Sequence, residues 1–298
     1  MFSATRHRIA ALALGVCFIL PVQAKNQPYG EIANMQARHI ATVFPGRMTG
    51  TPAEMLSADY IRQQFADMGY QSDIRSFHSR YIYTSRNKTK NWHNVTGSTV
   101  IAAHEGKAAE QIIIMAHLDT FAPMSDADTD NNLGGLTLQG LDDNAAGLGV
   151  MLELAERMKN IPTKYGIRFI ATSGEEEGKL GAENLLKRMS NEEKKNTLLV
   201  INLDNLIVGD KLYFNSGQST PSSVRKLTRD RALAIARSPA ATRIIRKERA
   251  VVTTAKCLIK RAFRCCTLRR RTGVWARKMD INSGRKRKRS RRGQAGIT

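Results

Sequence analysis

Side chains that bind metals or transfer protons stand at four points of this 298-residue chain. The four segments are His117-Leu118-Asp119, Asp142-Asp143-Asn144, Glu175-Glu176-Glu177 and Asp204. Zinc binds imidazole nitrogen and carboxylate oxygen at about 2.0–2.2 Å, and a catalytic zinc keeps one position for water. Two zinc ions about 3.5–4 Å apart share a carboxylate between them, and another carboxylate must carry the proton of the attacking water. The residue types and their order therefore predict a two-metal hydrolase.

Each segment also has a plain structural interpretation when it is taken alone. His117 with Asp119 could be a buried structural pair, and the three glutamates could form a solvated charged turn. Asp142 to Asn144 could cap a helix, since Asp and Asn are preferred there. Asp204 alone indicates nothing. The metal-hydrolase prediction depends on the four segments occurring together, in this order, at the ends of predicted elements.

The elements that must position these side chains follow from the spacing of apolar residues. Helices are predicted over residues 31–44, from Thr51-Pro52 to Phe65, and over 143–158 and 181–189. Strands are predicted over 72–83, 94–103, 111–116, 164–172 and 197–203, with the first two paired. Strands alternating with helices predict an α/β fold with a mostly parallel mixed sheet flanked by helices.

The predicted strand ends bring the four segments to one edge of the sheet. Ligands of such sheets gather where strands end and loops begin. His117, Glu175 and Asp204 each follow the end of a predicted strand. Asp143 is predicted to open a helix, where an acidic residue is favourable beside the positive end of the helix dipole.

The first 24 residues have the pattern of a secretory signal peptide. Arg6 and Arg8 precede an apolar run from Ile9 to Val22, which closes on Val22-Gln23-Ala24. A basic start, a short apolar segment and a small residue at the cleavage point are typical of such signals, although a buried N-terminal helix is the alternative. The pattern predicts a periplasmic protein with Lys25 at its mature N-terminus. No internal apolar run reaches the roughly 18 residues of a membrane span, so no stable span is expected after cleavage.

The four motifs together resemble those of the co-catalytic zinc aminopeptidases of clan MH. Within this group, residues 30–237 are most similar to the periplasmic alkaline phosphatase isozyme conversion aminopeptidases. The motifs that carry the resemblance are Ala116-His117-Leu118-Asp119-Thr120, Leu141-Asp142-Asp143-Asn144-Ala145-Ala146-Gly147, Ser173-Gly174-Glu175-Glu176-Glu177-Gly178 and Asn202-Leu203-Asp204. The resemblance implies a zinc exopeptidase-like fold and two Zn²⁺ ions. It also implies peptide or protein N-termini as substrates, with arginine as the residue that is removed.

The resemblance also implies a role for each site residue. His117 and Asp204 would hold one zinc, Asp143 would bridge, and Glu176 would hold the second zinc. Glu175 would be the general base, and Asp119 would orient the His117 imidazole; Asp142 is the alternative bridge. The family's last ligand is a histidine near the C-terminus, whereas every histidine here, at 7, 39, 78, 93, 104 and 117, precedes residue 118. The second zinc site is therefore expected to be incomplete, and the chain poorly stable and weakly active or inactive.

The last sixty residues differ in composition from the rest of the chain. Residues 241–298 carry a net charge of +18 out of the total +21, and their sequence shows no helical or strand period. The segment could be a basic arm for nucleic acid or a membrane surface, a disordered tail, or a product of a shifted reading frame. A frameshift near Ser238 is favoured, because the codons of residues 254–264 in another frame permit a sequence like the family's C-terminal half.

These observations divide the chain into a signal peptide (1–24), a truncated zinc peptidase domain (25–237) and a basic, out-of-frame tail (238–298). With the tail lost to a frameshift, the C-terminal part of the fold would be incomplete, and the sheet would have an unpaired edge. Two other functions stay open. The same ligands could serve a carboxypeptidase or another amide hydrolase. Alternatively, a catalytically dead body could present the tail to anionic partners, although an exported protein is not expected to meet nucleic acid.

Overall fold

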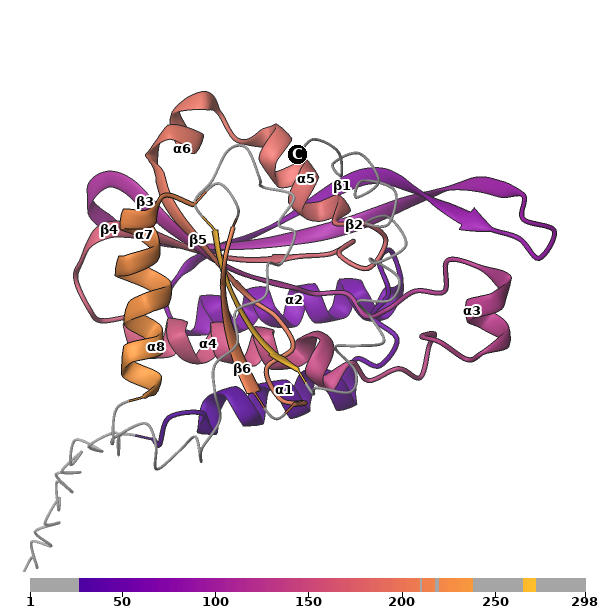
Figure 1. The fold of residues 1–298 in the computed structure, drawn as a ribbon, viewed down its shortest axis with the longest axis horizontal. Coiled ribbons are helices and arrows are strands. Elements are labelled where there is room, and N and C mark those ends of the chain that lie inside the picture. Colours follow the sequence, from indigo (N-terminus) through magenta and orange to yellow (C-terminus); the bar gives the residue numbers. More distant parts are fainter. Residues whose placement is uncertain (1–26, 210, 218–219, 238–264, 272–298) are drawn as a thin grey trace, which may run out of the picture.

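A seven-stranded mixed sheet forms the centre of the computed structural model, which describes residues 27–209, 211–217, 220–237 and 265–271 (Figure 1). The strand order is β1-β2-β4-β3-β5-β7-β6, and β4, β3, β5 and β7 run parallel to one another. The predicted α/β fold with a mostly parallel mixed sheet is confirmed. The strands are β1 (Gln71–Thr84), β2 (Lys90–His104), β3 (Gly106–His117), β4 (Thr163–Thr172), β5 (Thr197–Leu203), β6 (Lys211–Ser216) and β7 (Cys265–Arg271).

Helices cover both faces of this sheet (Figure 1). One face packs against α1 (Glu31–Val43), α2 (Pro52–Asp67) and α4 (Ala146–Met158), and the other against α5 (Leu180–Arg188) and α6 (Asn191–Asn196). The described part also contains the short helices α3 (Asp126–Asp130), α7 (Ser222–Arg225) and α8 (Arg231–Ala236), and the π-helical turns η1 (Leu141–Ala145) and η2 (Lys226–Asp230). Within that part, no helix combines the length and the apolar character needed to cross a bilayer.

The burial of β3 in the centre of the sheet explains why the five residues before His117, 112–116, are all apolar. Ile114 and Ala116 face the cluster formed with α1, α2 and α4, while Ile113 and Met115 face the cluster beneath α5. Successive side chains of a strand point to opposite faces, so a strand covered on both sides needs apolar residues throughout. This burial fixes the register of β3 and with it the position of His117 at its end.

The first two strands extend beyond the rest of the sheet. β1 and β2 pair along their whole length, from Gln71 opposite Ala103 to Thr84 opposite Lys90. β2 pairs with β4 only over residues 99–104, so among the described strands residues 90–97 pair with β1 alone. Figure 1 shows this two-stranded ribbon projecting beside α3. Its tip is held there, because Tyr83 Oη donates to Asp126 Oδ1 at 2.7 Å.

One predicted helix begins later than expected. The helix predicted to open at Asp143 begins at Ala146, because Asp143 and Asn144 have non-helical backbone angles and a cis peptide bond joins them. The Asn144 amide explains the difference: its Nδ2 donates to the Leu203 carbonyl at the end of β5, and its Oδ1 accepts the Gly147 N–H. Asp143 therefore lies on an irregular turn before α4 and not within its first turn.

The predicted signal peptide and most of the predicted basic tail lie outside the described residues. One part of that tail differs from the prediction: residues 265–271 form β7, between β5 and β6. No strand period was found in residues 239–298, so β7 was not predicted; β6, which within the described part pairs with β7 alone, forms this edge of the sheet. The short run Cys265-Cys266-Thr267-Leu268, which pairs with β5 along the backbone, is too brief to give a period among its basic neighbours.

Candidate metal centre

His117 is the residue around which the candidate site is built. It ends β3 and is 4% exposed. Its Nε2 lies 2.9 Å from Asp143 Oδ1 and 3.8 Å from Asp204 Oδ1. Asp204 directly follows β5, the parallel neighbour of β3, so the two strand ends deliver their side chains to the same edge.

The glutamate pair approaches the same imidazole from the end of β4. Two groups of possible ligand atoms result, one from His117, Asp143 and Asp204, the other from His117, Glu175 and Glu176. Within each group the atoms lie within 4.8 Å of one another. The structure thus brings together the five side chains that the sequence singled out for metal binding and proton transfer, and both groups share His117.

Asp119 connects the end of β3 with the glutamate turn. Its carbonyl oxygen lies 3.0 Å from His117 Nδ1, and its Oδ1 lies 3.5 Å from the same nitrogen. The carbonyl can only accept, so Nδ1 carries the hydrogen and Nε2 faces Asp143 and Asp204. Asp119 Oδ2 also accepts the Glu176 N–H at 3.0 Å. The buried Asp119 therefore orients the imidazole and anchors the glutamate turn.

The electrostatics of the site show an excess of negative charge. Burial alone would lower the pKa of His117, but the contacts with Asp119, Asp143 and Asp204 outweigh it and raise this pKa well above its usual value. Burial, followed by the charge of Asp143, raises the pKa of Glu176 to about 9. A cation that lies among such carboxyl groups stabilises their ionised form. The donor set of one imidazole and several carboxylates therefore fits zinc.

The structure distinguishes between the two acids of the Asp142-Asp143 pair. Asp142 Oδ1 accepts the backbone N–H groups of Ile207 and Val208, at 2.7 Å and 3.0 Å. Asp142 thus holds the segment that follows Asp204, whereas Asp143 is the acid that contacts His117. Between the two alternatives for a bridging position, the geometry favours Asp143.

A buried arginine that the sequence did not single out connects two of the metal-site segments. The Arg47 side chain is fully buried, and its guanidinium donates to the carbonyls of Leu118, Gln139 and Gly140 at 2.6–3.0 Å. Leu118 lies between His117 and Asp119, and Gly140 precedes the segment that carries Asp143. Burial lowers the pKa of Arg47 to about 10, against the opposing effect of Asp119 and Asp143.

Two further charged residues support the glutamate turn. Glu54 on α2 is buried, accepts the Ser98 N–H at 3.0 Å, and forms a short hydrogen bond with the Ser173 hydroxyl at the end of β4. Lys179, which follows the turn, forms an ion pair with Glu175. Burial lowers the pKa of Lys179, but the charge of Glu175 outweighs this and leaves the pKa raised. Lys179 thus holds the carboxylate that was predicted to be the general base.

Within the described part of the chain, no second imidazole reaches this site. The remaining described histidines contact other groups: His39 stacks on Tyr60, His93 on Tyr83, His78 Nδ1 lies 2.9 Å from Thr96 Oγ1, and His104 Nε2 lies 3.0 Å from the Ile161 carbonyl. Since no histidine follows His117 in the sequence, the described site relies on one imidazole for both groups of ligand atoms.

Comparison with known proteins identifies relatives by sequence. Residues 99–254 match the model of peptidase family M28. The chain is 84% identical to the alkaline phosphatase isozyme conversion protein of Escherichia coli (strain K12) over 238 residues, which are 80% of this chain and 69% of that protein. It is 32% identical to aminopeptidase YwaD of Bacillus subtilis (strain 168) over 145 residues, which are 44% of this chain and 28% of that protein.

Solved structures show where the same fold occurs. The zinc aminopeptidase BSAP from Bacillus subtilis superposes with a TM-score of 0.60 at 15% identity, covering 80% of this chain and 84% of that one. A glutaminyl cyclase from Porphyromonas gingivalis gives a TM-score of 0.60 at 16% identity, covering 82% and 84%. The fold is therefore shared by enzymes that are named for different reactions, and the site residues must decide between them.

Proposed function

We propose that this chain, which belongs to peptidase family M28 and has an aminopeptidase among its relatives, removes N-terminal residues from peptides or proteins. The observation that carries the proposal is the meeting of Asp143, Asp204 and the Glu175-Glu176 pair at the single buried imidazole of His117. These residues come from four segments that are far apart in the sequence. Several half-buried acids gathered at one buried imidazole repel one another unless a cation lies among them, so the arrangement supports a metal-dependent hydrolase.

In this proposal, His117, Asp143, Asp204 and Glu176 hold the metal. Zinc, when bound, supplies a Lewis acid that polarises the scissile carbonyl and lowers the pKa of a water molecule. Glu175 takes the proton of the attacking water and delivers it to the leaving amine. Lys179 keeps the Glu175 carboxylate in one orientation. The surplus of carboxylates favours a substrate that carries a free, positively charged α-amine.

The finer details of the substrate and the compartment are also proposals. The relative from Escherichia coli is named for the conversion of alkaline phosphatase isozymes. We propose that this chain trims N-terminal residues, with arginine preferred, from exported proteins in the periplasm. The basic and apolar pattern of residues 6–24 supports export.

The experiment that tests the proposal compares substrates with and without a free amine. We expect zinc-loaded protein to cleave arginine p-nitroanilide and to leave its N-acetylated form intact, with activity lost on dialysis against a chelator. A Glu175→Gln variant should lose activity by at least about a hundredfold because the proton acceptor is removed. Glu192→Gln, which changes an exposed glutamate on α6, is the matched control and should keep full activity.

The opposite substrate preference would identify a different enzyme. Cleavage of N-acylated amino acids, or of C-terminal residues, in place of free N-termini would assign the site to an amide hydrolase or a carboxypeptidase. Absence of any hydrolysis by zinc-loaded, folded protein would instead support a catalytically dead body.

A further inference from the structure

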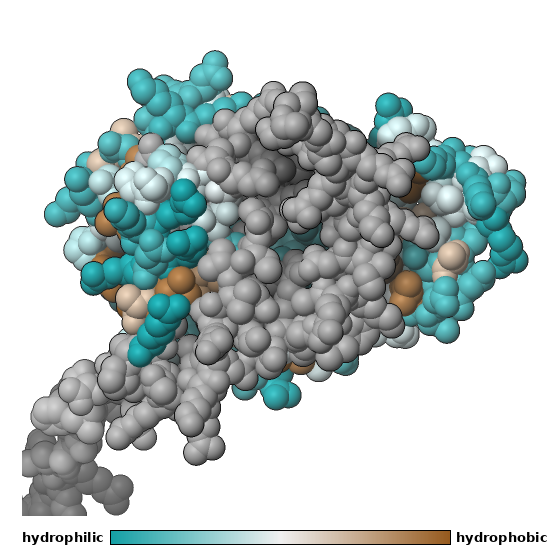
Figure 2. Space-filling model, viewed as in Figure 1, coloured by the Kyte–Doolittle hydropathy of each residue, from teal (hydrophilic) through white to brown (hydrophobic). Residues whose placement is uncertain are grey.

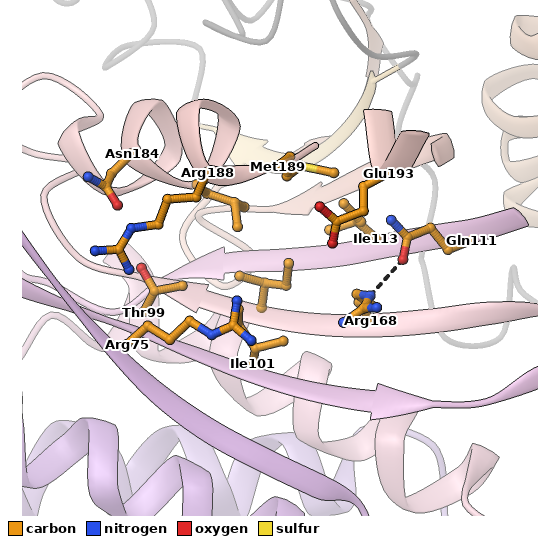
Figure 3. A pocket seen from close by; sticks show the side chains of 12 residues that line it. Arg75, Thr99, Ile101, Gln111, Ile113, Arg168, Asn184, Arg188, Met189 and Glu193 are labelled. Carbon is orange, nitrogen blue, oxygen red and sulfur yellow. Dashed lines mark hydrogen bonds between the residues drawn. The ribbon is translucent and has the colours of Figure 1, made fainter. Parts of the chain in front are cut away.

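A pocket lies beneath α5, on the sheet face opposite to α1, α2 and α4, and shares no residue with the metal centre (Figure 3). It encloses about 530 Å³, including space open to solvent. Its floor consists of Ile101, Ile113 and Ile170 on three neighbouring strands. Its polar walls contain three arginines from three elements: Arg75 of β1, Arg168 of β4 and Arg188 of α5.

The charges of this pocket are not balanced by the groups around it. Arg75 pairs with the exposed Asp73 at 3.1 Å. Among the described residues, neither Arg168 nor Arg188 forms an ion pair. One carboxylate, that of Glu193, lines the pocket from α6, and it accepts the Ser190 N–H of its own helix cap. Even with Asp73 and Glu193 counted against the three arginines, the pocket keeps a net positive charge.

Two of the guanidinium groups are held in place by neutral partners. Arg168 is half-buried beside the isoleucine floor, and its Nε donates to Gln111 Oε1 at 2.6 Å. Gln111 is fixed in turn, because its Nε2 donates to Thr197 Oγ1 at 2.9 Å. Arg188 donates from one Nη to the Ser76 carbonyl at 2.8 Å. Both groups keep further N–H donors for a ligand, since a guanidinium carries five.

The sheet register gives the spacing between the two ends of the pocket. Arg188 is bonded to Ser76, which pairs with Ser98, and Thr99 lies beside this end. Arg168 pairs with Ala103, four residues beyond Thr99 along β2. Counted from Ser98 the separation is five residues, and counted from Thr99 it is four, so at about 3.3 Å per residue the two ends are about 13–17 Å apart along the strands. Figure 3 shows Arg188 descending from α5 at the Thr99 end and Arg168 beside Gln111 at the other.

We propose that this pocket binds an extended acidic peptide segment, with acidic residues at positions i and i+4 and an apolar residue at i+2. In an extended chain these three side chains share one face, and the outer two are about 13 Å apart. The acidic residues pair with Arg188 and Arg168, and the apolar residue covers the isoleucine floor. Arg75 adds a third positive charge along that floor. The partner is thus a protein that presents an acidic, strand-like segment.

The test uses fluorescent, N-acetylated peptides, which lack the free amine of an aminopeptidase substrate. The probe is acetyl-Glu-Ser-Leu-Ser-Glu-amide with a fluorophore on a C-terminal linker, and binding to the full chain is followed by anisotropy. We expect saturable binding that weakens as salt is raised, because partly exposed charge pairs are screened. Two control probes replace both Glu by Gln, or place the two Glu side by side. Both should bind at least about tenfold more weakly.

Variants of the protein assign the binding to this pocket. Arg188→Gln and Arg168→Gln should each weaken the probe at least about tenfold, since a charged hydrogen bond is lost. Arg188 is at the surface, so its variant is expected to fold even where Arg168→Gln does not. Arg38→Gln removes the same charge from an exposed position on α1 and should bind the probe like the parent. Equal binding of all three probes, equal binding by Arg188→Gln, or no binding to the parent chain would overturn the proposal.

Discussion

Arg47 is a single buried residue that supports the metal centre without being one of its candidate ligands. Its guanidinium joins the backbone on both sides of the site, at Leu118 beside His117 and at Gly140 before Asp143. The donors of the planar, forked group are spread over three nitrogens, whereas the three donors of a lysine ammonium all lie on one nitrogen and cannot reach the same set of carbonyls. Arg47 therefore sets the distance between the imidazole and the Asp143 carboxylate.

Replacement of Arg47 by lysine tests this role. Arg47→Lys keeps the charge but leaves buried carbonyls unpaired, which costs about 1–3 kcal/mol of unfolding free energy. We also expect zinc affinity, measured by competition with a chromophoric chelator, to fall at least about tenfold as the two segments move apart. Arg38→Lys, on the exposed side of α1, is the control and should change neither quantity. Unaltered zinc affinity in a destabilised Arg47→Lys protein would restrict Arg47 to a purely structural role.

The sequence was sufficient for the residues that could bind metal but not for those that position them. Imidazole and carboxylates in a fixed order indicate a metal site by their chemistry alone. Arg47 and Glu54 gave no such signal, because a charged residue next to a turn or on a helix normally faces water. A sequence feature that could have revealed Arg47 is its place between Pro45-Gly46 and the capped start of α2, where the chain must turn inside the fold.

At the scale of elements, helix α1 depends on a cap supplied by another helix. Its N-cap residue, Gly30, has no side chain that could accept the free backbone N–H groups, and the carboxylate of Glu153 on α4 accepts them instead. Glu153 Oε1 accepts the Gly30 N–H at 2.8 Å and its Oε2 accepts the Ala33 N–H at 2.9 Å. Arg157 pairs with the same carboxylate. One buried side chain thus satisfies the open end of α1 and fixes it against α4.

A Glu153→Gln variant should be destabilised by about 1 kcal/mol at pH 7, as for other lost caps. Burial raises the pKa of Glu153, but the hydrogen bonds from Gly30, Ala33 and Arg157 outweigh it and leave the pKa lowered. A lowered folded-state pKa stabilises the fold above the unfolded pKa, and this stabilisation is lost as the pH falls through the folded value. The difference between parent and variant, measured by urea unfolding, should therefore shrink in acid below about pH 4.

The control for this experiment lies one turn along α4. Glu156 pairs with Lys159 at the surface, so Glu156→Gln should change the unfolding free energy by less than about 0.5 kcal/mol. A Glu153→Gln difference that stays constant from pH 7 to pH 3 would contradict the charged cap.

Apolar periodicity predicted well those helices and strands that are stabilised mainly by burying one apolar face against the core. The helices from 31 and from 51, and the five strands up to 203, are present within a few residues of their predicted ends. The start of α4 was missed because side-chain hydrogen bonds of Asn144 to Leu203 and Gly147 compete with the helical turn. The apolar periodicity of a single segment carries no information about a contact with a residue as distant in the sequence as Leu203.

For the molecule as a whole, the shared imidazole limits how many metal ions the chain retains. Both groups of ligand atoms need His117, and a catalytic zinc usually has three protein ligands. We expect about one zinc per chain after dialysis against metal-free buffer, measured by atomic emission. His117→Ala should reduce this to nearly none, whereas His104→Ala, outside the site, should leave it unchanged. Retention of about two zinc ions per chain would show that a second complete site exists.

The overhang of the first two strands gives different parts of β2 different exchange behaviour. The amides of residues 99–104 lie within the sheet, so their hydrogens exchange for deuterium only when the sheet itself opens. Residues 90–97 belong to a ribbon of two strands, which is marginally stable alone, and we expect their amides to exchange by local fraying. The boundary falls at Ser98, whose N–H is bonded to Glu54. The slowest and the fastest exchange regimes thus meet within one strand, next to the residue that supports the glutamate turn.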